Sequence, residues 1–209
     1  MPEPFTTLTG VAAPLLVDDI NTDQITPVQR SRNLHPDYAR VLFSGLRYRE
    51  DGSDSPDFIL NQPGFRNTRI LVTGSNFGCG SSREGAVWAM AAFGIRCIVA
   101  RSFADIYREN CLKNGVLPVV LPPADSQVFE AKVIETAGAA PFTADLENQR
   151  IRCPDGTGFV FDIAPAERTA LLEGLDDIGL TLKHADEIAA WENRTSGERP
   201  WLQAPVERR

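Results

Sequence analysis

Short apolar runs alternate with longer mixed segments through the middle of the chain. Three of the runs are rich in β-branched residues and have the length of buried strands: 69–73, 95–100 and 116–121. The mixed segments between them, 84–93 and 103–115, carry apolar residues at helical spacing, and Gly94 follows the first of them as a helix end. The order strand–helix–strand–helix–strand over 69–121 predicts a parallel βαβαβ unit, because crossover connections of one hand place successive strands side by side.

Each of the two predicted helices has an expected inward face. The side chains expected to be buried from the first helix are Val87, Trp88, Ala91 and, at the margin, Ala92. The expected apolar positions of the second helix are Phe103, Ile106 and Cys111, and its predicted N-cap is Ser102.

The pattern outside this unit predicts smaller elements around the same core. In chain order they are an opening strand or hairpin over 1–17, a short extended piece over 24–28, a short helix or turn over 58–60, a helix from 122–125 to Thr136, a hairpin over 142–163 with its turn at 154–158, a helix over 165–172, a loop over 174–182 and an amphipathic helix over 183–191. The polar, proline-punctuated residues from Asn193 onward predict a surface tail, in which Trp201 and Leu202 would be exposed apolar groups unless a partner covers them. We therefore expect a single domain over 1–195 and a C-terminal tail over 196–209.

The Gly-rich stretch 74–84 lies between the strand 69–73 and the helix that follows it. Strand, Gly-rich turn and helix form the arrangement that directs backbone N–H groups toward an anion. Ser81, Ser82 and Arg83 stand at the start of the helix, and an arginine can bind a carboxylate through two parallel hydrogen bonds. The alternative is local, because either serine could be the N-cap with Glu84 helping to close the helix. The stretch matches neither the P-loop nor the G-x-G-x-x-G dinucleotide motif.

Two other polar stretches have both a functional and a purely structural interpretation. Residues 18–23 combine three acids with turn formers, which favours Asx-turns and caps over a cation site, because the glycine and distant glutamate of a calcium loop are missing. Residues 29–49 carry the one local excess of arginines. They form either a solvated surface loop with a helix or a functional loop.

Length, composition and charge exclude several classes of protein. The 209 residues suffice for one domain with a sizeable core, and the composition is that of an ordinary globular protein. The net charge of 21 − 28 = −7 argues against nucleic acid or an anionic membrane as the main partner. No apolar run approaches the roughly 18 residues of a membrane span, and residues 1–5 show no secretory signal.

The cysteines show no metal-binding pattern. Cys79, Cys97, Cys111 and Cys153 form no C-x-x-C motif, and the chain has only two histidines, so we predict no metal site. The simplest interpretation is four free thiols in a reducing, cytoplasmic compartment. Cys79 differs because it lies inside the Gly-rich stretch, where it is either a small residue that fits or a thiol that contacts substrate or is sensitive to oxidation.

Four ordered segments together identify a family. The stretch 76–84, Asn-Phe-Gly-Cys-Gly-Ser-Ser-Arg-Glu, resembles the signature of the aconitase swivel domain and, more closely, of the small subunits of 3-isopropylmalate dehydratases. Three other segments agree with that family in the same order: 19–25, 102–118 and 174–182. The resemblance covers most of the chain. It implies an α/β fold, an aconitase swivel-like β/β/α domain with a parallel βαβαβ core and additional antiparallel strands.

The resemblance also implies a reaction and a division of labour. The small subunits of this family are parts of hydro-lyases, which remove water from a 2-hydroxy diacid and add it back at the neighbouring carbon. The resemblance thus implies the conversion of 2-isopropylmalate to 3-isopropylmalate in leucine biosynthesis. The implied roles are Ser81 as the base, Arg83 as its partner and carboxylate ligand, and Ser82 and the backbone of Gly80 as further parts of the anion site. The resemblance also implies that residues 29–49 form a substrate-specificity loop over the bound substrate, with Arg30 and Arg32 as the candidate substrate ligands. A [4Fe–4S] cluster would be held by a separate large subunit and not by this chain, so that the chain is half of an active site that binds a small dicarboxylate.

One position departs from the family pattern, because Gly85 stands where the family commonly has histidine. This departure leaves related substrates open, namely citramalate, dimethylmalate and homoaconitate. A non-enzymatic anion-binding or interaction module with the same fold is the alternative of a different class. Without its large subunit, the isolated chain could also form a homo-oligomer.

Overall fold

The computed structural model of the protein describes residues 2–27, 37–199 and 201. A seven-stranded sheet in the order β4-β3-β2-β1-β5-β6-β7 runs through these residues. Its strands are β1 Thr7–Leu15, β2 Thr68–Thr73, β3 Cys97–Ala100, β4 Leu117–Val119, β5 Phe142–Asp145, β6 Arg150–Arg152 and β7 Gly158–Val160. The α-helices are α1 Thr22–Ile25, α2 Tyr38–Val41, α3 Ser44–Arg47, α4 Gly85–Phe93, α5 Asp105–Lys113, α6 Pro123–Thr136, α7 Pro165–Glu173, α8 Asp177–Leu182 and α9 Ala185–Glu198, and the 3-10 helices are η2 Ile59–Asn61 and η3 Pro63–Phe65.

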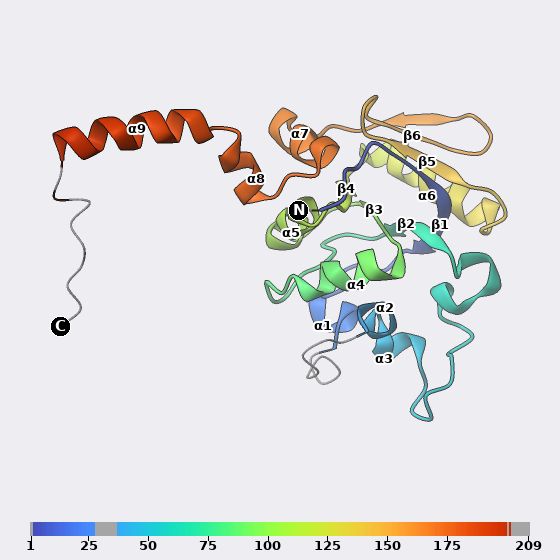
Figure 1. Ribbon diagram of the computed structural model, residues 1–209. Helices are drawn as coiled ribbons and strands as arrows, with labels where there is room; N and C mark the ends of the chain where they lie inside the picture. The colour runs from blue at the N-terminus through green and yellow to red at the C-terminus, as the bar shows by residue number, and fades with distance from the viewer. Residues whose placement is uncertain (1, 28–36, 200, 202–209) are drawn as a thin grey trace.

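The predicted parallel unit is confirmed. Strands β2, β3 and β4 pair in parallel, and α4 and α5 are the crossovers between them (Figure 1). The opening strand β1 lies inside the sheet, where residues 11–15 pair in parallel with β2 and residues 7–10 pair antiparallel with β5. The strand therefore joins the parallel half of the sheet to the antiparallel half, which together give the expected aconitase swivel-like fold.

Two apolar layers cover the parallel strands. Alternate residues of a strand point to opposite faces, so Ile70 and Val72 pack toward α6 and the antiparallel strands, whereas Leu71 packs toward α4 and α5. Leu42 and Phe43, from the segment between α2 and α3, are fully buried in the second layer. The interpretation of 29–49 as a solvated surface segment is therefore wrong at these two residues.

The faces of α4 and α5 differ from the prediction. Val87 is fully buried, but Trp88 is 41% exposed, Ala92 is exposed, and Ala86, Ala89 and Met90 are the other buried residues of α4. Nearly every residue of this helix is apolar, so apolar spacing cannot determine which side faces the sheet. In α5, Cys111 is buried as predicted, whereas Ile106 is 53% exposed and the buried position is Tyr107.

Several predicted boundaries also differ from the structure. Residues 24–25 belong to α1 and are not extended, and residues 177–182 form α8 where a loop was predicted. The predicted hairpin has three strands, because 146–149 turn the chain between β5 and β6 in addition to the turn between β6 and β7. The last helix, α9, runs to Glu198, past the predicted start of the tail.

Helices α8 and α9 extend away from the sheet (Figure 1). No residue of α9 is buried, and Trp201 beyond it is 68% exposed. Other large apolar side chains of this region are also exposed, namely Ile178, Leu182 and Trp191. None of the helices within the described residues is long and apolar enough to cross a membrane.

Candidate active site

The Gly-rich stretch leaves the carboxyl end of β2 and reaches the start of α4, as the sequence predicts. Two of its glycines have positive φ angles, +80° at Gly78 and +100° at Gly80. A Cβ on Gly78 would lie only 2.1 Å from Cγ of the buried Tyr107. Both the left-handed backbone and the close approach to Tyr107 therefore require glycine at position 78.

The stretch is fastened to the acidic segment that precedes α1. Backbone N–H groups of Ser75 and Gly78 donate to the Asp18 carboxylate and to the Ile20 carbonyl, at 2.6 and 2.8 Å. The side-chain amide of Asn76 donates to Asp19 at 2.7 Å. Asn21 is the N-cap of α1, which confirms the predicted cap, whereas the carboxylates of Asp18 and Asp19 bind the Gly-rich stretch and not a local turn. Among the described residues, no group of three or more His, Cys, Asp or Glu side chains could hold a metal ion.

Ser81 lies in a small hydrogen-bonded cluster with residues from α1. Its Oγ accepts a hydrogen bond from Nε of Arg83 at 2.7 Å and lies 3.1 Å from Oγ1 of Thr22. The guanidinium of Arg83 also donates through Nη2 to Asp23. The guanidinium of Arg83 thus binds both a serine hydroxyl and a carboxylate, and these two contacts fix the direction of the side chain.

The interpretation of Ser81 or Ser82 as a helix cap is wrong. The N-cap of α4 is Glu84, and no side chain caps that helix. Ser81 and Ser82 are both exposed beside Gly80. The hydroxyl of Ser81 serves the cluster with Thr22 and Arg83 instead of the helix end. The structure thus brings Gly80, Ser81, Ser82 and Arg83 together in one open turn.

The N-cap prediction for Ser102 is also wrong. The N-cap of α5 is Ala104, which makes no side-chain cap. The hydroxyl of Ser102 accepts a hydrogen bond from the backbone N–H of Asn76 at 2.7 Å. Ser102 therefore supports the Gly-rich stretch and not the helix that follows it.

The arginines of 29–49 divide into two groups. Arg30 and Arg32, the candidate substrate ligands, lie outside the described residues. Arg47 has a structural role, because it donates to the carbonyl oxygen of Ala39 at 2.8 Å and its guanidinium lies over the ring of Phe93.

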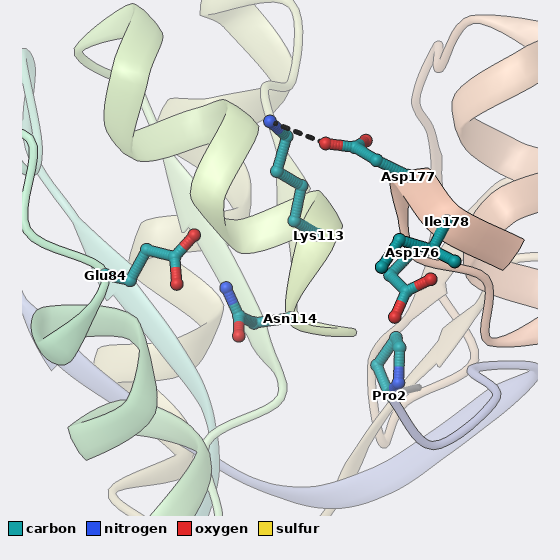
Figure 2. Close-up of a pocket in the computed structure, with 7 residues that line it drawn as sticks. All are labelled: Pro2, Glu84, Lys113, Asn114, Asp176, Asp177 and Ile178. Atoms are coloured by element: carbon teal, nitrogen blue, oxygen red, sulfur yellow. Dashed lines mark ion pairs between the residues drawn. The ribbon is translucent and has the colours of Figure 1, made fainter. Parts of the chain in front are cut away.

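A pocket of about 500 Å³ lies between the end of α5 and the start of α8 (Figure 2). Glu84 lines one side of it, so the pocket adjoins the residue that follows Arg83. Lys113 forms an ion pair of 3.1 Å with Asp177 across the pocket. Asp176 caps α8 by accepting from the N–H of Gly179 at 2.7 Å. The ion pair thus links α8 to the end of α5, whereas Asp176 serves the start of α8 itself.

The thiols occupy two kinds of surroundings. Cys97, Cys111 and Cys153 are free and buried, and burial raises the pKa of each, to about 11 for Cys153. Cys79 is also free but half-buried in the Gly-rich stretch, where its Sγ lies 3.5 Å from the carbonyl oxygen of Asp19.

Comparison with known proteins gives a consistent result. The family described as the aconitase C-terminal domain matches residues 2–124, and the one described as the C-terminal domain of the 3-isopropylmalate dehydratase small subunit matches 177–205. Proteins named 3-isopropylmalate dehydratase small subunit from Azorhizobium caulinodans and Xanthobacter autotrophicus are each 50% identical over 202 residues, 96% of this chain and 100% of theirs. The chain belongs to the family of 3-isopropylmalate dehydratase small subunits.

A solved structure shows the same fold. The crystal structure of 3-isopropylmalate dehydratase from Methanocaldococcus jannaschii aligns with a TM-score of 0.60 and 24% identity, and the match covers 89% of this chain and 99% of that one. This likeness confirms the swivel-like fold that the four sequence segments predicted.

The prediction of site residues omitted Thr22 and Asp23, which the structure places against Ser81 and Arg83. They lie about sixty positions earlier in the chain, so no local pattern could connect the two segments. The one available signal was that 19–25 is a segment shared with the small-subunit family.

Proposed function

We propose that this chain is the small subunit of a 3-isopropylmalate dehydratase, the hydro-lyase that interconverts 2- and 3-isopropylmalate in leucine biosynthesis. Its full-length relatives at 50% identity carry that name. The observation that carries the proposal is the contact of 2.7 Å between the Ser81 hydroxyl and the Arg83 guanidinium. A serine that is to remove a proton from carbon needs such a cation beside its oxygen, because the alkoxide is otherwise too unstable to form.

In the proposed reaction, Ser81 removes the proton from the carbon next to a carboxylate. The electron pair of that C–H bond becomes the new C=C bond, the bond to the neighbouring hydroxyl breaks, and the hydroxyl leaves as water with a proton from an acid that we assign to the partner subunit. The same groups work in reverse when water returns with the hydroxyl on the adjacent carbon. Nε of Arg83 stabilises the oxygen of Ser81 while it is charged. Asp23 holds Nη2, and we assign Nη1 to a substrate carboxylate.

Gly80 and Ser82 complete the proposed anion site. Gly80 has a positive φ angle and no side chain, so a carboxylate can approach its backbone closely. Ser82 is exposed next to the base and can donate to the same carboxylate. Arg30 and Arg32 remain proposed ligands for the variable side group of the substrate.

The described residues of this chain do not suit an iron–sulfur cluster. Such a cluster needs three or four thiolates in one place, whereas three of the four thiols are buried and no cluster of potential ligands is present in the described part of the chain. We therefore assign the [4Fe–4S] cluster to the large subunit, where it would act as a Lewis acid on the leaving hydroxyl.

An open half-site fits a partner subunit. Ser81, Ser82 and Asp23 are exposed, although a reaction of this kind benefits from the exclusion of water. The large subunit would close this face around the diacid. We place the assembled enzyme in the cytoplasm, where the four free thiols would stay reduced.

The test is reconstitution under anaerobic conditions. The chain is mixed with the cluster-loaded large subunit from the same source, and loss of 2-isopropylmalate and formation of the unsaturated diacid are followed. Activity is expected only with both subunits. Activity on citramalate, dimethylmalate or homoaconitate alone would keep the reaction and change the substrate. The absence of activity on all four diacids, with both subunits folded and the cluster intact, would refute the proposal and favour a non-enzymatic module.

Two substitutions test the assigned roles in the active assembly. We expect Ser81→Ala to lower kcat by roughly 10²- to 10⁴-fold, the usual contribution of a positioned base. Arg83→Lys should also lower kcat, because one ammonium cannot replace a fork that holds Ser81 and Asp23 together. Ser53→Ala and Arg66→Lys, exposed changes in the loops before β2, are the matched controls and should leave kcat unchanged. Normal turnover by Ser81→Ala would remove Ser81 as the base.

A further inference from the structure

Thr22 is a buried hydroxyl residue that touches an exposed serine. Thr22 is 1% exposed, although its Oγ1 lies 3.1 Å from Oγ of the exposed Ser81. The same Oγ1 accepts a hydrogen bond from the backbone N–H of Ser81 at 3.2 Å. Thr22 thus contacts both the backbone and the side chain of one residue, 59 positions further along the chain.

The number of protons available determines how these hydrogen bonds are arranged. A threonine hydroxyl has one proton to donate and two lone pairs to accept with. One lone pair of Thr22 accepts from the N–H of Ser81, and Nε of Arg83 already donates to Oγ of Ser81. While Ser81 is neutral, the bond between the two hydroxyls can run in either direction. Once Ser81 has lost its proton, only the hydroxyl of Thr22 can donate in that bond.

We propose that Thr22 is a positioning residue that donates a second hydrogen bond to the Ser81 oxygen when that oxygen is an alkoxide. The Ser81 oxygen would then accept two hydrogen bonds, one from the charged guanidinium of Arg83 in the turn and one from the neutral hydroxyl of Thr22 in α1. This inference rests on the proposed role of Ser81 as the base.

The surroundings of Thr22 fix the position of its hydroxyl. The backbone N–H of Thr22 donates to the carbonyl of Cys79 at 2.8 Å, and the Thr22 carbonyl accepts from the N–H of Thr26 at 2.9 Å. The capping box of Asn21 and Gln24 closes the turn on which Thr22 lies. A β-branched side chain has few rotamers available, and a donor that is already oriented costs no reorganisation when charge develops. Because Thr22 is buried, its hydroxyl also acts at low local dielectric.

A thiol at position 81 tests this donor without the partner or the substrate. In a Cys79→Ser background, Ser81→Cys places an exposed thiol among three buried native ones. The rate of alkylation by iodoacetamide as a function of pH gives the pKa of that thiol. Adding Thr22→Val removes the hydroxyl and keeps the β-branched shape. We expect the thiol pKa to rise and alkylation at neutral pH to slow by roughly tenfold, the lower end of the effect of one hydrogen bond to a charged group.

Two further variants separate donation from packing. Thr22→Ser keeps the hydroxyl and loses the methyl, so the pKa of the thiol at position 81 should equal the value measured with Thr22 in place. Thr68→Val is the matched control, because Thr68 is also a buried threonine with one short side-chain hydrogen bond, to the carbonyl of Phe65 at 2.6 Å. It should lower the midpoint of thermal unfolding without moving the thiol pKa.

The assembled enzyme provides the second measurement. With Ser81 in place, Thr22→Val should lower kcat by roughly ten- to a hundredfold with KM within about threefold, and the acid limb of the kcat profile should move to higher pH. An unchanged thiol pKa in the Thr22→Val variant, or a Thr22→Ser variant as impaired as Thr22→Val, would overturn the proposal. Inactive wild-type assemblies would instead overturn the proposed function, and the thiol titration would still decide whether Thr22 donates.

Discussion

Replacing Gly78 by alanine should destabilise the chain more than the backbone conformation alone explains. At φ +80°, any side chain has left-handed strain, which is about 1–2 kcal/mol. The new Cβ would also lie 2.1 Å from Cγ and 2.6 Å from Cβ of Tyr107. Forcing an extra carbon into a packed core typically costs a further 1–3 kcal/mol or so. The sum is a loss of roughly 2–5 kcal/mol.

Tyr107 has little room to move away from that methyl group. It is 2% exposed, and its ring packs edge-on against Phe77 with centroids 5.3 Å apart. Phe77 is itself fully buried and packs against Phe103. Relief of the clash would therefore require several buried rings to shift together, in a core that is already closely packed.

Gly52→Ala is the control for this measurement. Gly52 has φ +83°, nearly that of Gly78, but nothing lies within 4 Å of the position that its Cβ would take. The control therefore carries the backbone strain without the clash, about 1–2 kcal/mol. Urea unfolding of the isolated chain, followed by far-UV circular dichroism, gives the free energy of unfolding of each variant. Equal losses for the two alanines would refute the reasoning, because they would show that Tyr107 gives way at no cost.

Two other predictions follow from buried groups. Glu130 is buried and accepts two hydrogen bonds from Arg101, which lower the pKa of its carboxyl group. The contribution of Glu130 to the stability of the fold is therefore fully present above the unfolded pKa of about 4.3 and is lost as the pH falls through the lower folded pKa. Glu130→Gln should thus cost about 1–2 kcal/mol in urea unfolding at pH 7, and a difference from wild type that persists undiminished below about pH 3 would contradict this. A thiol reagent at pH 8 should label Cys79 first and Cys153 only after unfolding, because burial raises the pKa of Cys153 to about 11; equal labelling rates in the native protein would show that Cys153 is accessible.

The sequence predicts the parallel strands and their crossovers well. Strands β2, β3 and β4 are buried on both faces, so each appears in the sequence as a short, largely apolar run. The face of α4 was predicted less well, because a helix made almost entirely of apolar residues has no polar side to show its orientation. Trp88 lies at the margin, where its Nε1 donates to Asn114 at 2.9 Å and its ring meets Tyr38 edge-on.

Hydroxyl residues near helix starts show a second limit of local sequence patterns. Ser81 and Ser102 have the sequence context of N-caps. In the structure, however, the hydroxyl of Ser81 contacts Thr22 and Arg83, and the hydroxyl of Ser102 accepts a hydrogen bond from the N–H of Asn76. Capping is worth only about 1 kcal/mol, so one competing hydrogen bond is enough to redirect a serine. The contacts of Ser81 and Arg83 with Thr22 and Asp23 could be predicted only by similarity to a family, because the two segments are about sixty positions apart in the chain.

The anchoring of the Gly-rich stretch determines what a partner subunit still has to supply. The groups that hold Ser81 come from this chain alone: Thr22 from α1, Arg83 from the turn, and Asp23 behind the guanidinium. Their hydrogen bonds form without substrate, so the proposed base and its nearest donors would be in place before a diacid arrives. Preorganised donors of this kind lower a barrier because they need not rearrange as charge develops. In the proposed enzyme, the large subunit would then contribute closure of the exposed face and the chemistry of the leaving hydroxyl, while the geometry of proton transfer would be set by the small subunit.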